Sequence, residues 1–495
     1  MRMEKLKIKE NFHVFGIATI VYALIYVICM FDNGSGIAYL IFAIATLAFI
    51  GFCMKKLGVP LRKGSAFYII TIMMLAISTF CTDDTRIIFL NKIAVFFLVI
   101  TFVLHTAYDM DEWNLEKYIL SVITVLCLSI GEIIRPFSDA IWYLKNKMDK
   151  RSNKIFYALA GTFIALPLFM LIFALLSSAD AIFGEMSKKM YYLFSFENIF
   201  LMGIMFTFMF MMSYCILAFM EKRNISKEVK DTKTGEPFLA IPVVFLLSVM
   251  YIVFSGIQIA SLFFRKMQLP ESYTYASYAR EGFFQLLLVS VINLVIVLVC
   301  LYRFKENKLL KGLLIIMSLC TFIMIASSAM RMILYIQYYY LTVLRIFVLW
   351  SLLVLTFIFT GVLISIIKAD FPMIRYSVIV ITCLYVGLSF SHPDYWIAKV
   401  NIEGMKERTN TFYDYYFLTK LNTDAAPVLI DYMIEEGYCI EEFYENEDKY
   451  SNIAYNKNTF GYEYLRRIED RAYGNVGRRF NLSRYIGQKY YYLKK

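Results

Sequence analysis

Twelve apolar blocks, most of them about 20 residues long, constrain this chain more than any other feature. A helix needs about 20 apolar residues to cross the roughly 30 Å of hydrocarbon in a bilayer. The chain is therefore expected to cross a membrane many times. The candidate spanning blocks are Phe12–Phe31, Gly36–Met54, Ala66–Cys81, Ile87–Thr106, Tyr118–Ile134, Ile155–Leu176, Ile199–Met220, Phe238–Phe264, Gly282–Tyr302, Leu310–Met330, Leu341–Ile367 and Met373–Ser391.

Composition supports the same class of protein. Of the 495 residues, 60% are hydrophobic and 18% are charged, whereas a soluble domain is roughly 45 to 50% apolar and about 25% charged. The expected fold is an all-α polytopic membrane helical bundle of 11 or 12 crossing helices, followed by a small C-terminal all-helical domain.

Charge and cysteine content exclude several other classes. The net charge of +11 does not indicate nucleic acid as a partner, because lysine and arginine cluster between apolar blocks, as topogenic charges do. No cysteine pair has the spacing of zinc ligands, and three histidines in total argue against a metal centre. We therefore expect no metal site, disulfide framework or cofactor.

Basic connections indicate the orientation, because loops rich in lysine and arginine face the cytoplasm. They place the N-terminus in the cytoplasm and predict a plasma membrane location. The basic connection 135–154 conflicts with strict alternation through 12 crossings, which would put it outside. Eleven crossings, with Tyr118–Ile134 re-entrant or interfacial, remove the conflict and are favoured; 12 crossings with a violation of the charge rule are the alternative.

The character of the chain changes after Ser391, which predicts two domains, 1–391 and 392–495. The second segment contains no apolar run of membrane length and is rich in tyrosine and charge. Thr423 as N-cap and Gly437 as C-cap delimit a short amphipathic helix. Similar patterns around 410–421, 460–474 and 482–495 complete a helical domain, which the favoured topology places outside the cytoplasm.

Polar residues in or beside the apolar blocks are functional candidates, because polar groups at membrane depth are costly. Glu281, Gln285 and Asn293 lie within an arc of roughly 120° on a helical wheel, and Arg280 points to the opposite side. These residues either fix helix packing by hydrogen bonds or line a polar cavity that opens to the outer face.

Arg331 and Arg345 are further candidates. They are 14 residues apart, nearly four helical turns, so both would face one way if the helix were continuous. They are interpreted as counter-charges for Glu281 or as donors to an anion, since arginine suits bidentate contacts with carboxylates and phosphates. The tyrosines between them are typical of an interfacial aromatic belt.

Several segments resemble a bacterial multi-pass membrane family catalogued as domain of unknown function 4173, related to 4153. They are "LLSSADAIF", "YAREGFFQLLLVSVIN", "RMILYIQYYYLTVLR", "HPDYWIAKVNI" and "DYYFLTKLNTDAAPVLI", between about Leu175 and Met433. The resemblance implies the same fold class and a membrane location, without an established activity. It adds a tail motif of His392, Asp394 and Asn401. Gln285 and His392 depart from the glutamate and asparagine that the family pattern leads us to expect.

Two functions are compatible with these features, and no catalytic motif favours an enzyme. The first is a transporter-like or lipid-handling membrane protein with an outward-facing polar pocket. Its residues would be Arg280, Glu281, Gln285, Asn293, Arg331 and Arg345. The alternative is a non-catalytic membrane sensor or assembly partner that binds a protein through 392–495.

Overall fold

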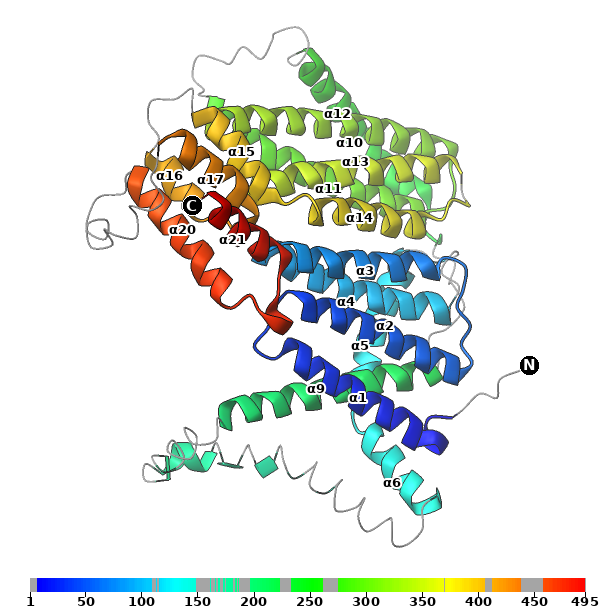
Figure 1. Ribbon diagram of the computed structural model, residues 1–495. Coiled ribbons are helices and arrows are strands. Elements are labelled where there is room, and N and C mark those ends of the chain that lie inside the picture. The colour runs from blue at the N-terminus through cyan, green and yellow to red at the C-terminus, as the bar shows by residue number, and fades with distance from the viewer. Residues whose placement is uncertain are drawn as a thin grey trace. The chain divides into compact units, whose positions relative to one another are not determined.

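The computed structural model describes residues 7–108, 113, 115–147, 196–222, 233–260, 275–368, 370–405, 412–437 and 457–494, with scattered residues between 161 and 186. Regular structure in this part of the chain is helical (Figure 1). Among the described residues, a single isolated bridge joins Gly235 to Phe304. The predicted all-α class is confirmed.

The helices follow the predicted blocks closely. Those before residue 223 are α1 (Phe12–Met30), α2 (Ile37–Leu57), α3 (Ser65–Cys81), α4 (Thr85–Ala107), α5 (Leu115–Gly131), α6 (Arg135–Lys147) and α9 (Phe196–Lys222). Five long helices follow: α10 (Pro237–Ile259), α11 (Tyr275–Arg303), α12 (Lys308–Tyr339), α13 (Val343–Ile367) and α14 (Met373–Ser389). The C-terminal helices are α15 (Pro393–Met405), α16 (Phe412–Thr419), η3 (Thr423–Ala425), α17 (Ala426–Glu435), α20 (Lys457–Tyr473), η4 (Gly477–Arg479) and α21 (Leu482–Lys494).

Eight of the described helices are long and apolar enough to cross a membrane, which confirms a polytopic bundle. They are α1, α2, α4, α9, α10, α11, α12 and α13. The apolar helix α3 has 17 residues, and α14 passes the same test together with α15, from which a bend of 59° separates it. We treat α14 as the spanning part. The predicted block Ile155–Leu176 lies mostly outside the described residues.

Helix ends follow from local sequence signals. The side chain of Asn307 accepts hydrogen bonds from the first backbone N–H groups of α12, and Gly58 ends α2 in the left-handed conformation. Gly437 follows α17 with φ of +77°, as predicted. The N-terminal cap of this region is Asn422 and not the predicted Thr423. The physical reason is that η3 precedes α17, and Asn422 accepts a hydrogen bond from the N–H of Asp424 at 2.9 Å.

The chain divides into two compact units. The first comprises Met1–Ile77, Ile93–Tyr108 and Ile119–Ser226, and in it α1 packs against α2 and α9. The second comprises Ser78–Lys92, Asp109–Tyr118 and Lys227–Lys495, and in it α12 packs against α10, α11 and α13. The predicted boundary after residue 391 falls inside the second unit, where α15 and α17 share an apolar core with the start of α13. A separate domain from 392 to 495 stays a prediction.

Contacts between helix ends constrain how often the chain crosses a membrane, because hydrogen-bonded segments outside the bilayer must lie on the same side of it. A ring nitrogen of His105, at the end of α4, lies 3.0 Å from the carbonyl oxygen of Lys63, so α3 and α4 cross as a pair. The backbone N–H of Ile8 donates to Glu221, which also forms an ion pair with Arg135. Ile8 and Arg135 therefore lie on one side.

These contacts argue against a membrane crossing by α5. Between Ile8 and Arg135 the four helices α1 to α4 already make an even number of crossings, and a fifth would separate the two residues. Between Ile8 and Arg135 the contacts thus agree with an interfacial or re-entrant α5, and the total of eleven crossings stays a prediction. Arg135 is held after α5 by Asp139 at 3.3 Å and by Glu221, and Tyr214 donates to Asp139 at 3.0 Å.

Candidate functional site

The packed face of α10 changes from apolar to polar along its length. Its buried stripe consists of Pro237, Ala240, Val244, Ser248, Tyr251, Ser255 and Gln258. The last four side chains are polar and occupy the half of α10 that ends at Ile259. Together with the residues that they contact or accompany on α11 and α12, they form a set that we call the polar column: Ser248, Tyr251, Ser255, Gln258, Asn293, Thr321, Ser327 and Arg331.

Hydrogen bonds between helices link the polar column at two levels. At one level Tyr251 donates to Asn293 at 2.9 Å, and Asn293 donates to the hydroxyl of Thr321 at 2.9 Å. At the other level the side-chain oxygen of Gln258 accepts from Ser327 at 2.6 Å and from Arg331 at 3.4 Å. Such bonds join membrane helices because hydrocarbon supplies no other partner.

Two hydroxyls in the polar column have no hydrogen-bond partner among the described residues. They belong to Ser248 and Ser255, which are only 2% and 3% exposed. A serine on a helix commonly donates to the carbonyl four residues earlier, as Ser290, Ser318 and Ser328 do here. Buried hydroxyls without partners call for an occupant such as water or a polar solute.

The guanidinium of Arg331 lies at the end of the polar column, directly against the backbone of α11. Arg331 is 8% exposed, and a Cβ atom on Gly282 would overlap its guanidinium. Glycine at this position lets a large cationic group enter the helix interface. Asn293 and Arg331, both predicted, are therefore brought into one buried set.

The other predicted pocket residues are placed differently. The side chain of Gln285 is exposed on α11, and those of Arg280 and Glu281 lie outside the described residues. Arg345 is on another helix from Arg331, because α12 ends at Tyr339 and Tyr340 has a φ of +69°. Its guanidinium donates to the carbonyl oxygens of Tyr339 and Tyr340 and covers the ring of Tyr335, so it caps α12.

Asn401 from the predicted tail motif has a structural position. Its side-chain amide accepts from the N–H of Leu341 at 2.7 Å and donates to the carbonyl of Leu341 at 2.9 Å. It thereby satisfies both backbone groups of a residue between α12 and α13. This pairing ties α15 to the same end of α12 at which Arg331 lies.

The other two residues of that motif belong to a charged cluster, which also contains residues that sequence reasoning did not single out. We define the charged cluster as Asp83, Asp84, Arg86, His392, Asp394, Asp424, Arg471 and Arg484. It joins the connection between α3 and α4 to the start of α15, to η3 and to α20 and α21. The side chains of all four aspartates are at most 1% exposed.

Each guanidinium in the charged cluster contacts at least one carboxylate. Arg86 donates to Asp84 at 2.8 Å and to Asp394 at 2.7 Å, so these aspartates share it. Asp83 accepts from Arg484 at 2.7 Å and from Arg471. The carboxylates thus serve as partners for arginine, and no group of three or more acidic, cysteine or histidine residues among the described residues could hold a metal ion.

Asp424 has a different set of partners. It accepts from the hydroxyls of Thr82, at 2.5 Å, and Ser483, and its Oδ2 lies 3.3 Å from Nδ1 of His392. The other member of the tail motif, Asp394, also accepts from the backbone N–H of Asn422 at 3.0 Å. A signal for this cluster was present in "HPDYW" and "LNTDAAP", which carry the family resemblance, whereas "TDDTR" reads as an ordinary polar connection.

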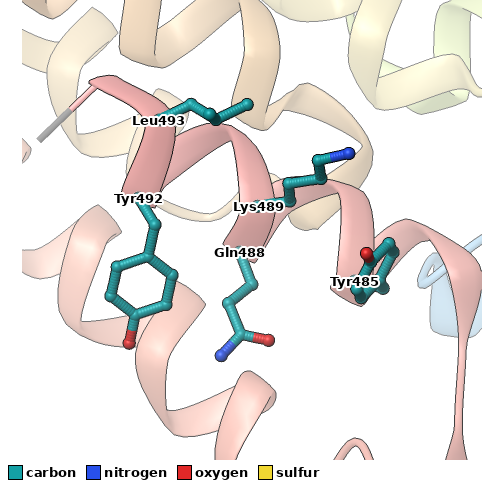
Figure 2. Close-up of a pocket in the computed structure, with 5 residues that line it drawn as sticks. All are labelled: Tyr485, Gln488, Lys489, Tyr492 and Leu493. Atoms are coloured by element: carbon teal, nitrogen blue, oxygen red, sulfur yellow. The ribbon is translucent and has the colours of Figure 1, made fainter.

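An open cavity of about 290 Å³ lies on α21, in the C-terminal helices. The residues that line it all belong to that helix and are Tyr485, Gln488, Lys489, Tyr492 and Leu493 (Figure 2). Tyr492 and Leu493 are largely exposed there.

Comparison with known proteins identifies a family and no activity. The model of a domain of unknown function, DUF4153, matches residues 69–432, nearly three quarters of the chain. No curated protein and no solved structure matches the chain significantly. The match includes the polar column, His392, Asp394 and Asp424, and the narrower assignment to domain 4173 stays a prediction. A match of this extent shows that the chain belongs to the DUF4153 family of proteins.

Proposed function

We propose that the chain is a transporter-like protein of a bacterial plasma membrane, in which the polar column contacts a small hydrophilic solute. The observation that carries this proposal is the pair of buried, partnerless hydroxyls of Ser248 and Ser255 on one stripe of α10. A hydroxyl buried without a partner costs about 1 to 3 kcal/mol in proteins, so its retention twice on one stripe favours a polar occupant. Arg331 and Gln258 would meet that occupant at the end of the polar column.

The proposed orientation places the N-terminus in the cytoplasm and the C-terminal helices outside. Lysine and arginine concentrate in the short connections near Ile8, Lys63 and Arg135, and this distribution supports a cytoplasmic location for them. The loop between α3 and α4 lies across the membrane from those connections, and its Asp83 and Asp84 contact the C-terminal helices. Arg331 lies at that outer end, since Leu341 is bonded to Asn401.

The two other predicted functions have less support. Lipid handling would use the same outward-facing residues and stays a prediction. Binding of a protein through 392–495 would have to use an exposed surface such as the cavity on α21. The polar column favours solute handling because it lies in the membrane part, where polar groups are costly to retain.

Cysteine labelling from the outer side tests both the polar column and the orientation. We expect a hydrophilic methanethiosulfonate reagent, added to intact cells, to modify the variant Ser255→Cys, because the polar column is reached by water. The native Cys439, in the segment after α17 and outside the described residues, is expected to react in the same experiment. Mass spectrometry of peptides identifies which cysteine has been modified.

The matched control is Ile257→Cys, two residues along α10 on a face that is 60% exposed toward lipid. It is expected to stay unmodified, since the thiolate that reacts does not form in hydrocarbon. An unmodified Ser255→Cys beside a modified Cys439 would refute the solute pathway and leave the orientation intact. Modification of Cys439 only after the membrane is permeabilised would refute the orientation.

A further inference from the structure

The charged cluster contains one more carboxylate than it has guanidinium groups. Asp83 has Arg471 and Arg484, while Asp84 and Asp394 share Arg86. Asp424 is the aspartate that contacts no guanidinium among the described residues. The basic group beside it is the imidazole of His392.

Burial makes the excess of one carboxylate over the guanidinium groups energetically unfavourable. The Asp424 side chain is 1% exposed, and a buried carboxylate without a counter-charge carries a large desolvation penalty. Hydroxyl donors such as Thr82 and Ser483 reduce that penalty without cancelling the charge. One proton on His392 would balance the charged cluster, and the 36% exposed imidazole side chain can exchange that proton with water.

We propose that His392 and Asp424 form a proton-binding site that locks the C-terminal helices onto the connection between α3 and α4. The ligand is a proton taken from the outer solution. When the proton is bound, imidazolium and carboxylate form an ion pair that joins α14 and α15 to η3. When it is lost, Asp424 is left as an unpaired buried anion, and the contact opens more readily.

Other charged groups face this pair from each element packed around it. From the connection between α3 and α4 these are Asp83, Asp84 and Arg86, and from α15 Asp394. From α20 and α21 they are Arg467, Arg471 and Arg484, with the phenol of Tyr464. Arg86, Arg471 and Arg484 are already bonded to Asp83, Asp84 and Asp394, and Arg467 acts on the phenol of Tyr464. His392 is therefore the basic group that contacts Asp424.

The direction of titration agrees with this arrangement. The hydrogen bond with Asp424 raises the pKa of His392 above its usual value, which is about 6.5 in the unfolded chain. Stability from this proton is therefore fully present below about pH 6.5 and is lost as pH rises through the raised pKa. Burial raises the pKa of Asp394 to about 6, so that group responds in a lower range, from about 6 down to its unfolded value.

His392 also occupies the break between two helices. It has a φ of +47°, in the left-handed region, and precedes Pro393, where the chain bends by 59° between α14 and α15. A positive φ is uncommon for a residue other than glycine and costs free energy, so surrounding contacts must hold it. The ion pair with Asp424 is one such contact, which couples the proton to the bend.

Hydrogen exchange of the full chain in lipid nanodiscs tests the proposal between pH 6.5 and 8.5. After correction for intrinsic exchange, we expect the opening constant of α17 to rise with pH. The rise should be about tenfold for each unit by which Asp424 raises the pKa of His392. The variant His392→Gln should remove this dependence and show the high-pH behaviour of the native chain throughout. His105→Gln, which changes one of the two other histidines, should retain it.

A second variant keeps the proposal falsifiable if His392→Gln folds poorly. Asp424→Asn leaves three carboxylates facing three guanidinium groups, so its opening constant should be independent of pH over the same range. At pH 8.5 it should open less than the native chain. An opening constant of the native chain that does not change with pH, or one that still changes in both variants, would overturn the proposal.

Discussion

Replacing Asp83 by asparagine is expected to release α20 and α21 from the connection between α3 and α4. Asp83 is fully buried and accepts from both Arg471 and Arg484, one on each of those elements. Asparagine keeps the shape but leaves two guanidinium groups without a carboxylate. Breaking a buried ion pair costs about 3 to 5 kcal/mol, and the partial exposure of both arginines favours the lower figure.

The measurement is the opening constant of α20 and α21 by hydrogen exchange, which should rise on the order of 100-fold for about 3 kcal/mol. Glu306→Gln is the matched control, with its opening constant measured at the start of α12, because Glu306 also meets two cationic groups, Lys233 and Lys311, but is half exposed. An exposed pair of this kind contributes about 0 to 1 kcal/mol. Equal effects of the two substitutions would show that burial of Asp83 does not strengthen its contacts.

A double substitution separates the pairing from other losses. Asp83→Asn combined with Arg484→Gln should cost less than the sum of the two single changes, since the second removes a cation that the first leaves unpaired. Additive costs would mean that the two residues do not depend on each other.

The membrane architecture could be predicted because each of the eight candidate spanning helices corresponds to a continuous apolar block of the sequence. The conflict over the basic connection 135–154 has a local cause, since α5 has 17 residues and is not among the eight described helices that are long and apolar enough to cross a membrane. Whether α5 crosses the membrane depends on contacts between residues that are far apart in the sequence. Arg135 pairs with Glu221, and Glu221 accepts a hydrogen bond from the backbone of Ile8. The hydrophobic periodicity of the sequence indicates neither contact.

The two buried polar sets differ in how far the sequence indicates them. On α10 the spacing of Ser248, Tyr251, Ser255 and Gln258 is helical and could have revealed a polar stripe from the sequence alone. The charged cluster has no such pattern, because Asp83 and Arg484 are 401 positions apart. Arginines in a polar tail and aspartates in a short loop are typical of solvated surface, and only the fold brings them together.

The substitution Gly282→Ala is expected to destabilise the bundle of α10 to α13, although alanine is the better helix former by about 1 kcal/mol. The added methyl group would overlap the guanidinium of Arg331, which is buried and bonded to Gln258. Overpacking of this kind costs about 1 to 3 kcal/mol. Thermal unfolding of the purified chain should show a lower midpoint.

Two glycines on the neighbouring helices provide matched controls. A Cβ atom at Gly256 of α10 or Gly312 of α12 would meet no heavy atom within 4 Å, so alanine there should leave the midpoint unchanged or raise it. Replacing Arg331 by methionine in the Gly282→Ala background should recover part of the loss, because the unbranched side chain can leave the contact.

The sign of the Gly282→Ala effect also bears on the proposed solute pathway. A lowered midpoint that Arg331→Met restores would mean that the guanidinium is held against α11, so a solute must approach it from the side of Gln258 and Ser255. A midpoint as high as in the glycine controls would mean that Arg331 has room to move away from α11. The polar column would then have to be wider at its outer end than the packing of Arg331 against Gly282 implies.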